Sequence, residues 1–193
     1  MNSIPKEWSV IKIPNLVDPN LLKCDVPWER GQINYVKNGE VIFHKEEKQV
    51  NGSLSRYNYP RYKECHYDIK NKLESILQDK LYTTYYFDRF YFKGNDLKKH
   101  RDRGACEISV TVHISNNLDY DWPIYFENPI TGEPIEITCS PGDGVLYKGC
   151  DLYHWRNPMK GDYKSYFHQI FFHYVRANGH CLQFAFDQNN KVY

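Results

Sequence analysis

The stretch His100-Arg101-Asp102 places an imidazole and a carboxylate two residues apart, directly before a segment with a clear β pattern. In a strand, positions i and i+2 point to the same face, so His100 and Asp102 can aim at one point. Two histidines and one carboxylate form the facial triad that holds non-haem Fe(II) and leaves coordination positions open. This pair would supply two thirds of such a metal site.

The tripeptide pattern alone is not specific, because His-x-Asp or His-x-Glu occurs three times in the chain. His44-Lys45-Glu46 opens a charged run, which we expect in a solvated loop or at a sheet edge. His66-Tyr67-Asp68 falls in a predicted helix, where positions i and i+2 point apart. Only His100-Arg101-Asp102 lies at the start of a strand that leads into the predicted core.

A third ligand must come from downstream, where the chain offers His113, His154, His168, His173 and His180. His154 follows a tight turn and a short predicted strand, which would bring a later strand beside the first pair. His168 and His173 differ by an odd number of positions, so they face opposite sides of their predicted strand. Each of these histidines can also be an ordinary core or surface residue.

Hydrophobic periodicity predicts one helix followed by many strands. Apolar residues recur at spacings of three and four from Pro60 to about Leu81, which predicts a helix. The main strand predictions are 82–92, 106–115 and 165–176, and shorter strands flank turns at 130–133 and 140–143. Upstream, 33–36 and 40–44 predict a hairpin around Lys37-Asn38-Gly39. A helix packed on many short strands favours a jelly-roll or sandwich.

Length and composition narrow the class of protein. The 193 residues predict a single domain, with 1–81 as an N-terminal support and 82–179 as a jelly-roll core. The net charge of +1 provides no field that would hold nucleic acid or an acidic membrane. The six cysteines form no C-x-x-C pair, and no apolar leader or membrane-spanning run is present. We therefore expect reduced thiols and a cytoplasmic protein.

From about Tyr82 to Gly179 the sequence resembles the Fe(II)- and 2-oxoglutarate-dependent oxygenases, in particular the prolyl-4-hydroxylase-like branch. The resemblance depends on four features: His100-x-Asp102, His154, Lys164 ten residues later, and the Tyr91-x-x-Gly94 turn nine residues before the first ligand. The stretches HRDRGACEISVTVHIS, WPIYFENP, PGDGVLYKGCDLYHWRNP and HQIFFHYVRANG also resemble small bacterial and phage members of this group.

This resemblance implies a mainly β protein with flanking helices (α+β) and a double-stranded β-helix core. It implies a dioxygenase that hydroxylates its substrate and releases succinate and CO2. His100, Asp102 and His154 would be the catalytic metal ligands. Lys164 would pair with the distal carboxylate of 2-oxoglutarate, and Tyr91 would donate its hydroxyl to the same cosubstrate. The implied cofactors are Fe(II), 2-oxoglutarate and O2, with stimulation by ascorbate left open.

The sequence also allows expectations about where four cationic side chains lie. Because an aromatic strand follows Lys164, we expect its ammonium in a partly buried space, where it needs a partner. That partner is 2-oxoglutarate or the nearby Asp162. Arg101, Arg103 and Arg156 are expected at the mouth of the site, either as a solvated rim or as an attraction for an anionic substrate.

Three departures from the family pattern bear on the substrate. Trp122-Pro123-Ile124-Tyr125 stands where prolyl hydroxylases carry Gly-Gly-Glu-Thr, in a segment that can line the substrate side. This argues against a peptidyl-proline substrate. The arginine pattern of the DNA-repair demethylases is not evident. Asp102 is present where the related halogenases have a small residue, so halogenation is disfavoured.

The expected partner is a small-molecule or peptide substrate, with no nucleic acid and no membrane, and the oligomeric state stays open. Two other classes of function remain. One is a non-catalytic jelly-roll that binds a ligand, with the histidines as core or surface residues. The other is a cupin-like metalloenzyme that uses oxygen without 2-oxoglutarate and does not need Lys164.

Overall fold

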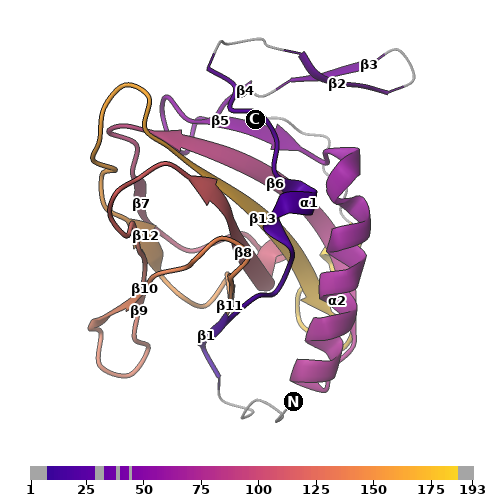
Figure 1. Cartoon of the computed structure of the whole chain (residues 1–193). Helices are drawn as coiled ribbons and strands as arrows, with labels where there is room; N and C mark the ends of the chain where they lie inside the picture. Colours follow the sequence, from indigo (N-terminus) through magenta and orange to yellow (C-terminus); the bar gives the residue numbers. More distant parts are fainter. Residues whose placement is uncertain (1–7, 29–32, 38–39, 44, 187–193) are drawn as a thin grey trace.

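The computed structural model describes residues 8–28, 33–37, 40–43 and 45–186. Its body consists of two antiparallel sheets that face one another, with one long helix, α2, on the outer side of the larger sheet (Figure 1). This is the mainly β double-stranded β-helix with flanking helices that the sequence predicts. The space between the two sheets is where a small molecule can be enclosed.

The larger sheet has seven strands in the order β1-β11-β8-β13-β6-β5-β4. Their bounds are β1 Val10–Ile13, β4 Lys45–Glu46, β5 Leu54–Tyr57, β6 Leu81–Phe92, β8 Ile108–Asn116, β11 Gly144–Tyr147 and β13 Tyr166–Arg176. The smaller sheet has the order β10-β9-β12-β7, with β7 Leu97–His100, β9 Ile124–Glu127, β10 Pro134–Ile137 and β12 His154–Arg156. A separate hairpin pairs β2 Ile33–Lys37 with β3 Glu40–Phe43.

Helical segments are few. They are α1 Pro19–Leu22, α2 Lys63–Leu77 and three 3₁₀ turns, η1 Pro60–Tyr62, η2 Gly104–Cys106 and η3 Leu182–Phe184. In α2, Ile69, Leu73 and Ile76 recur at helical spacing and are buried against the large sheet, as the sequence predicts. The helix ends at Leu77, however, because Gln78 takes the left-handed conformation (φ 53°). Leu81, predicted as the end of the helix, begins β6 instead.

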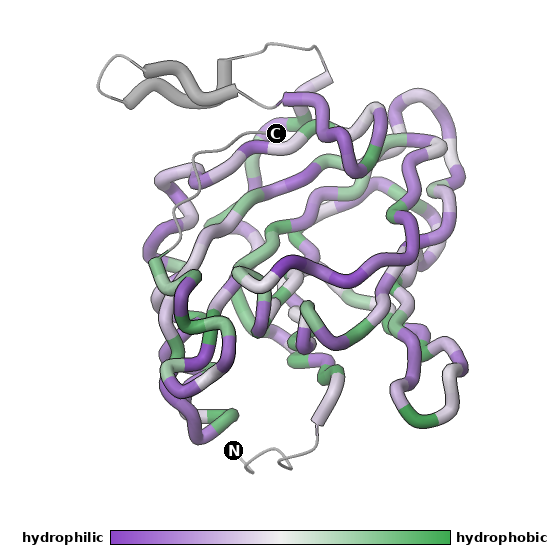
Figure 2. Tube along the Cα trace, turned by 180° about the vertical axis from the view of Figure 1, so that it is seen from behind, coloured by the Kyte–Doolittle hydropathy of each residue, from purple (hydrophilic) through white to green (hydrophobic). Residues whose placement is uncertain are grey.

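Because side chains alternate along each strand, the two faces of the large sheet are lined by different kinds of residue. Along β8, Ile108, Val110 and Val112 pack in the core beneath α2, while Ser109 and Thr111 face the space between the sheets. The close succession of green and purple along the chain in Figure 2 agrees with strands whose two faces differ in polarity. The helix side is therefore apolar core, whereas the inner side of the large sheet carries the polar groups that can do chemistry.

The hairpin predictions agree with the described strands. β2 pairs with β3, while the predicted turn residues Asn38 and Gly39, and His44, lie outside the described residues. β9 and β10 pair around the predicted turn at 130–133, which projects from the body in Figure 2. All six cysteines are free. No helix of the described residues is long and apolar enough to cross a membrane.

Candidate metal centre and its cavity

The histidine–aspartate pair and His154 meet between two strands of the small sheet. His100 ends β7, Asp102 follows two residues later, and His154 begins β12. The three side chains offer ligand atoms that all lie within 4.8 Å of one another. Oδ1 of Asp102 lies 3.4 Å from Nε2 of His100 and 3.6 Å from Nε2 of His154. The structure thus brings together all three predicted ligands.

Strand pairing explains why residues 54 positions apart converge. His154 stands directly opposite His100 in the antiparallel pair β12–β7. The Asp102 amide donates to the carbonyl of Gly149 at 2.9 Å, which ties the residue after β7 to the loop before β12. The sequence interpretation was wrong in one detail, because His100 is the last residue of β7 and Asp102 lies beyond it, so the pair does not open a strand. The turn η2 separates it from β8.

Both histidines are oriented for metal binding by backbone carbonyls. Nδ1 of His100 lies 2.7 Å from the carbonyl oxygen of Lys98, and Nδ1 of His154 lies 3.1 Å from that of Leu152. A carbonyl only accepts, so each Nδ1 carries the proton and each Nε2 presents its lone pair. The two free lone pairs and the Asp102 carboxylate fit a divalent transition metal by the chemistry of the donor set.

The local electrostatics support an ionised Asp102. Burial alone would raise its pKa, but the adjacent His100 and the neighbouring His154 and His173 together lower the pKa of Asp102. Burial lowers the pKa of His154, against the attraction of Asp102. At neutral pH Asp102 is therefore ionised and His154 is neutral, whereas Asp102 raises the pKa of His100 against the effect of its burial. A metal ligand set needs a carboxylate and neutral imidazoles, so metal binding competes with any proton on His100.

Gln49, from the segment between β4 and β5, contacts the centre from outside the small sheet. Its amide nitrogen lies 2.9 Å from Nε2 of His100, and its oxygen accepts from Nη2 of Arg89 at 2.9 Å. Because arginine only donates, the oxygen must face Arg89 and the NH2 group must face His100. Gln49 therefore bonds to the same lone pair that a metal would take, and it must release His100 when metal binds.

A cavity of about 210 Å³ opens beside the three ligands. Its walls combine guanidinium groups and rings: Gln49, Tyr57, Tyr85, Phe87, Arg89, Leu97, His100, Arg101, Asp102, Arg103, Cys106, Tyr147, His154, Phe171 and His173. Arg101 and Arg103 are exposed, as predicted for the mouth, and stack on Tyr153 and Tyr85 respectively. Arg89 is only 1% exposed and lies inside.

The two predicted cosubstrate residues have different positions. Tyr91 is fully buried on the inner side of β6, and its hydroxyl accepts from Nη1 of Arg89 at 3.2 Å. Lys164 is exposed, with its ammonium 5.5 Å from the centre of the Tyr163 ring, and it does not line the cavity. The expectation that Lys164 enters a partly buried space is wrong, because residues 161–164 form a turn before β13 begins.

A different cation, Arg156, occupies the interior. The sequence interpretation placed Arg156 at the mouth, but it is only 4% exposed and packs over the rings of Trp122 and Phe167. Its Nη groups donate to the Trp122 carbonyl and to Gln169, while Nε is buried without a partner among the described residues. Burial lowers its pKa. The sequence contained a signal for this inward position, because Arg156 lies two residues after His154 and therefore shares its strand face.

Trp122 begins the segment that, by the sequence, can line the substrate side. It is 6% exposed, its ring lies 5.0 Å from that of Tyr91, and its indole N–H donates to the carbonyl of Asn157. The guanidinium of Arg156 lies 4.5 Å from the centre of its ring, so Trp122 packs inside against this buried cation.

The remaining histidines have structural surroundings. His168 and His173 face opposite sides of β13, as their odd spacing predicts: His168 is stacked on Phe90, while His173 lines the cavity. His113 stacks on Phe167 inside the barrel, and the His180 side chain is 68% exposed. None of these four belongs with His100 and His154 in a group that shares a metal position.

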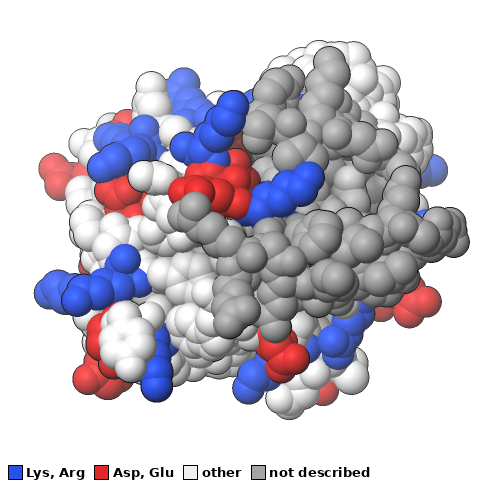
Figure 3. Space-filling view, turned by 90° about the horizontal axis from the view of Figure 1, so that it is seen from above, with Lys and Arg blue, Asp and Glu red and all other residues white. Residues whose placement is uncertain are grey.

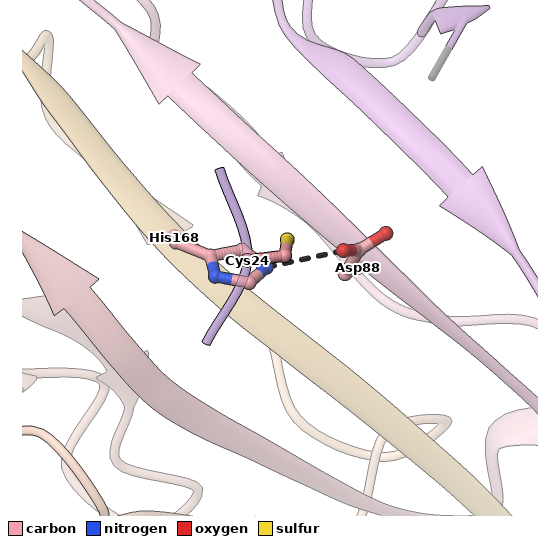
Figure 4. A group of neighbouring side chains, drawn as sticks. All are labelled: Cys24, Asp88 and His168. Carbon is pink, nitrogen blue, oxygen red and sulfur yellow. Dashed lines mark hydrogen bonds and ion pairs between the residues drawn. The ribbon is translucent and has the colours of Figure 1, made fainter. Parts of the chain in front are cut away.

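Two further groups of ligand-type residues lie close together. Cys24, Asp88 and His168 gather on the helix side of the large sheet (Figure 4). There the Asp88 carboxylate already receives Nη2 of Arg56 at 2.6 Å, and a guanidinium at that position repels a metal cation. The second group, Asp102, Cys106 and His173, shares Asp102 with the triad. Among the described residues, the group of His100, Asp102 and His154 is therefore the candidate metal site.

Comparison with known proteins adds evidence at the level of structure. No protein-family model matches the sequence, and no curated protein sequence shows significant similarity to it. A 2OG-Fe(II) oxygenase family protein from Burkholderia pseudomallei is similar in structure (TM-score 0.59, 12% identity, 90% of this chain and 88% of that one). A viral collagen prolyl hydroxylase from Paramecium Bursaria Chlorella virus-1, solved with 2OG, matches with TM-score 0.57, 13% identity and coverage of 89% and 97%.

The chain has the prolyl-4-hydroxylase-like fold of the 2OG-Fe(II) oxygenases. HygX from Streptomyces hygroscopicus, solved with nickel and 2-oxoglutarate, also shares this fold (TM-score 0.54, 10% identity, 86% of this chain and 82% of that one). At these identities the likeness concerns the fold alone. Within this oxygenase fold, the centre described above lies where β7 and β12 meet, facing the inner side of the large sheet.

Proposed function

We propose that this protein is an Fe(II)- and 2-oxoglutarate-dependent dioxygenase that hydroxylates a small molecule and releases succinate and CO2. The observation that carries the proposal is the convergence of His100, Asp102 and His154, with Nε2 of the two imidazoles 3.4 Å and 3.6 Å from Oδ1 of Asp102. When bound, Fe(II) supplies the activation of O2 that oxidatively decarboxylates 2-oxoglutarate and inserts oxygen into a substrate C–H bond.

The chain's own residues fix the ligands and keep the centre dry. The carbonyls of Lys98 and Leu152 hold the imidazole rings in the required tautomer. Tyr147, which is 2% exposed, packs 4.9 Å from the His154 ring and shields the centre on the barrel side. These contacts leave the opening toward Arg101 and Arg103 as the route for small molecules.

We further propose that Arg156 holds the distal carboxylate of 2-oxoglutarate. A buried guanidinium needs an anion, and the partners of Arg156 among the described residues are the Trp122 carbonyl and Gln169, with no carboxylate. Arg156 lies two residues after His154 in β12, on the same strand face. Tyr91, buried beside Trp122, is the second residue proposed for the cosubstrate, because its hydroxyl can donate to a carboxylate.

Metal binding tests the centre directly. Mn(II) titration followed by EPR should show one tight site in wild type, and His154→Ala should lose at least tenfold in affinity. His180→Ala is the matched control, because that histidine is exposed. Equal Mn(II) affinity in wild type and His154→Ala would remove the third ligand and, with it, the proposed centre.

Cosubstrate binding separates the rival functions. With Mn(II) present, 2-oxoglutarate should bind to wild type and to Lys164→Ala alike, while Arg156→Met should weaken binding about ten- to a hundredfold. A metal-binding protein without affinity for 2-oxoglutarate would favour the cupin-like alternative. Absence of both metal and 2-oxoglutarate binding would favour the non-catalytic jelly-roll. A loss on Lys164→Ala instead of Arg156→Met would return the cosubstrate contact to Lys164.

A further inference from the structure

We propose that the cavity beside the triad takes a small organic carboxylate with a hydrocarbon body, and that Arg89 binds its carboxylate. This names the substrate class and rests on the proposed oxygenase function. The inference follows from three features of the described residues: the environment of Arg89, the charge of the cavity wall, and a row of rings along the large sheet.

Arg89 is a rigidly held hydrogen-bond donor for an anion and lies next to the metal ligands. It is 1% exposed, and its Nε and Nη1 are held by Ser55 and Tyr91 at 3.2 Å each. Nη2 donates to the side-chain oxygen of Gln49, whose NH2 group contacts His100. One amide group thus separates the guanidinium from a metal ligand, so an anion bound to Arg89 would lie beside the reacting centre.

The Gln49 amide already has the shape of the group that we infer. A carboxamide and a carboxylate are both planar and have nearly the same size, and Gln49 gives Arg89 a neutral oxygen acceptor. Metal binding must displace the Gln49 NH2 group from His100. A ligand carboxylate can then replace the Gln49 oxygen on Nη2 of Arg89, which Glu47 also approaches at 3.5 Å. A carboxylate in its place would form a charge-assisted hydrogen bond, which is roughly twice as strong as a neutral one.

The cavity wall favours a negative ligand even in the loaded enzyme. Arg89, Arg101 and Arg103 line it, while Asp102 is its one carboxylate among the described residues. A divalent metal and a doubly charged 2-oxoglutarate cancel one another, so the excess of guanidinium groups remains. Glu47 approaches Arg89 at 3.5 Å and offsets one charge, which still leaves the wall positive.

The part of the wall that adjoins Arg89 carries a row of rings, and the guanidinium carbon lies 5.3 Å from the centre of the Phe87 ring and 5.5 Å from that of Phe171. Tyr57, Phe87 and Phe171 are cross-strand neighbours on β5, β6 and β13. Their rings stack in a row, with centroids 4.8 Å and 4.4 Å apart and interplanar angles of 16° and 11°. This row suits a hydrocarbon body, whereas a sugar or another polyol would lose hydrogen bonds to water there.

The size of the cavity and the outer surface argue for a small molecule. A volume of about 210 Å³ is below the usual range for drug-sized ligands, roughly 300–1,000 Å³. On the face seen from above, the Lys and Arg side chains of the described residues are interspersed with Asp and Glu (Figure 3), which is not the pattern of a polyanion-binding face.

The test compares acids with their uncharged amides. Benzoate, 3-phenylpropanoate and 4-methylpentanoate, each with its amide, are titrated calorimetrically into protein loaded with Mn(II) and saturating 2-oxoglutarate. At least one acid should bind ten- to a hundredfold more tightly than its amide, because a charge-assisted contact is present only in the acid. In Arg89→Met this preference should fall below about threefold, and Arg89→Lys should restore part of it.

Controls separate this inference from the proposed function. Arg61→Met, at an exposed arginine away from the cavity, should keep the full preference for acids. The affinity for 2-oxoglutarate and the melting temperature are measured for every variant, so a folding defect is recognised. Protein that binds Mn(II) and 2-oxoglutarate but no acid of the panel better than its amide would overturn the substrate class alone. An acid that displaces 2-oxoglutarate would instead assign Arg89 to the cosubstrate and also overturn the inference.

Discussion

Gly149 allows the Asp102 carboxylate to reach the metal position. A Cβ atom at residue 149 would meet Oδ2 of Asp102 at 2.6 Å, Oγ of Ser109 at 2.8 Å and the carbonyl oxygen of Cys106. Real Cβ atoms do not approach other atoms this closely, and the carbonyl is backbone that cannot turn away. The backbone of this glycine therefore acts as a wall that sets the position of the ligand carboxylate.

We predict that Gly149→Ala weakens Mn(II) binding about ten- to a hundredfold by shifting Asp102. Gly144→Ala is the matched control, since its Cβ would meet the Leu16 side chain at 2.5 Å, on the helix side. Both variants should lose about 1–3 kcal/mol of unfolding free energy through overpacking, but only Gly149→Ala should lose metal. EPR titration and urea unfolding measure the two effects. Unchanged Mn(II) affinity in Gly149→Ala would show that Asp102 adjusts freely.

His66 on α2 makes stability depend on pH. Its ring is enclosed by Tyr86, Phe172 and Tyr174, and Nε2 lies 3.1 Å from the carbonyl of His173. Burial lowers the pKa of His66 from 6.5 to about 4. Below pH 6.5 the unfolded chain takes up the proton and the folded protein does not, so stability falls as the pH drops toward 4 and levels off below it.

We predict that His66 alone makes the protein about 2 kcal/mol less stable at pH 5 than at pH 7. Its replacement in His66→Phe, which fits the same aromatic surroundings, should remove this share of the pH dependence. Urea unfolding at the two pH values measures it. His180→Gln, at an exposed histidine, should keep the wild-type dependence. An identical pH dependence in His66→Phe and wild type would mean that the ring protonates without leaving its place.

At the level of residues, the sequence did not identify the buried cation proposed to bind the distal carboxylate of 2-oxoglutarate. The proximity of His100, Asp102 and His154 could be predicted from the short spacing of the first pair and the turn before His154, although Asp102 lies beyond the end of β7 and not within a strand. Lys164 was selected by its offset from His154, and an offset takes no account of the turn at 161–164 that keeps it in solvent. Arg156 follows from strand alternation after His154, but its burial depends on Trp122, which packs over it from 34 residues away.

Among the elements, β5, β6 and the start of α2 are joined by one buried ion pair. Asp88 of β6 accepts Nε and Nη2 of Arg56 of β5, at 3.2 and 2.6 Å, and the hydroxyl of Tyr62 at 3.0 Å. Arg56 also lies 3.5 Å from the centre of the Tyr59 ring. Both charges are at most 1% exposed, so each depends on the other for the solvation that water no longer provides.

We predict that Asp88→Ala costs about 3–5 kcal/mol of unfolding free energy, because it leaves the Arg56 guanidinium buried without its counter-ion. The double variant Arg56→Met/Asp88→Leu should recover most of that loss, since neither charge remains. Urea unfolding at neutral pH provides the comparison. If Asp88→Ala and the double variant are equally destabilised, the loss of unfolding free energy comes mainly from the other contacts of the carboxylate and not from the unpaired guanidinium.

Element boundaries could be predicted less well than element types. The strands 82–92 and 165–176 agree with β6 and β13 because their aromatic and β-branched runs are long. The helix was extended to Leu81 because its leucine spacing continues past the true end. The left-handed Gln78 ends it without the glycine that usually marks a helix end, so no local signal was available.

For the whole molecule, we predict that 2-oxoglutarate binds only after the metal, and this loading order has a thermal signature. 2-Oxoglutarate should raise the melting temperature only when Mn(II) is present, since its chelating end needs the metal. At a hundred times its dissociation constant a ligand adds about 2.7 kcal/mol, which for a chain of this length corresponds to roughly 5–10 °C. Differential scanning fluorimetry with each ligand alone and with both measures this. A full shift by 2-oxoglutarate without metal would contradict the loading order.

The position of β13 has a consequence for synthesis of the chain. β13 lies between β8 and β6 in the large sheet, although it follows both in sequence. While the ribosome makes the intervening segment, at about 5–20 residues per second, β6 and β8 each present an unpaired edge along the gap. Such edges can pair with other nascent chains, so aggregation during expression should depend on how quickly residues 166–176 emerge. Because β13 completes the large sheet late, codon choice or a translational pause just before β13 should change aggregation more than the same change elsewhere in the chain.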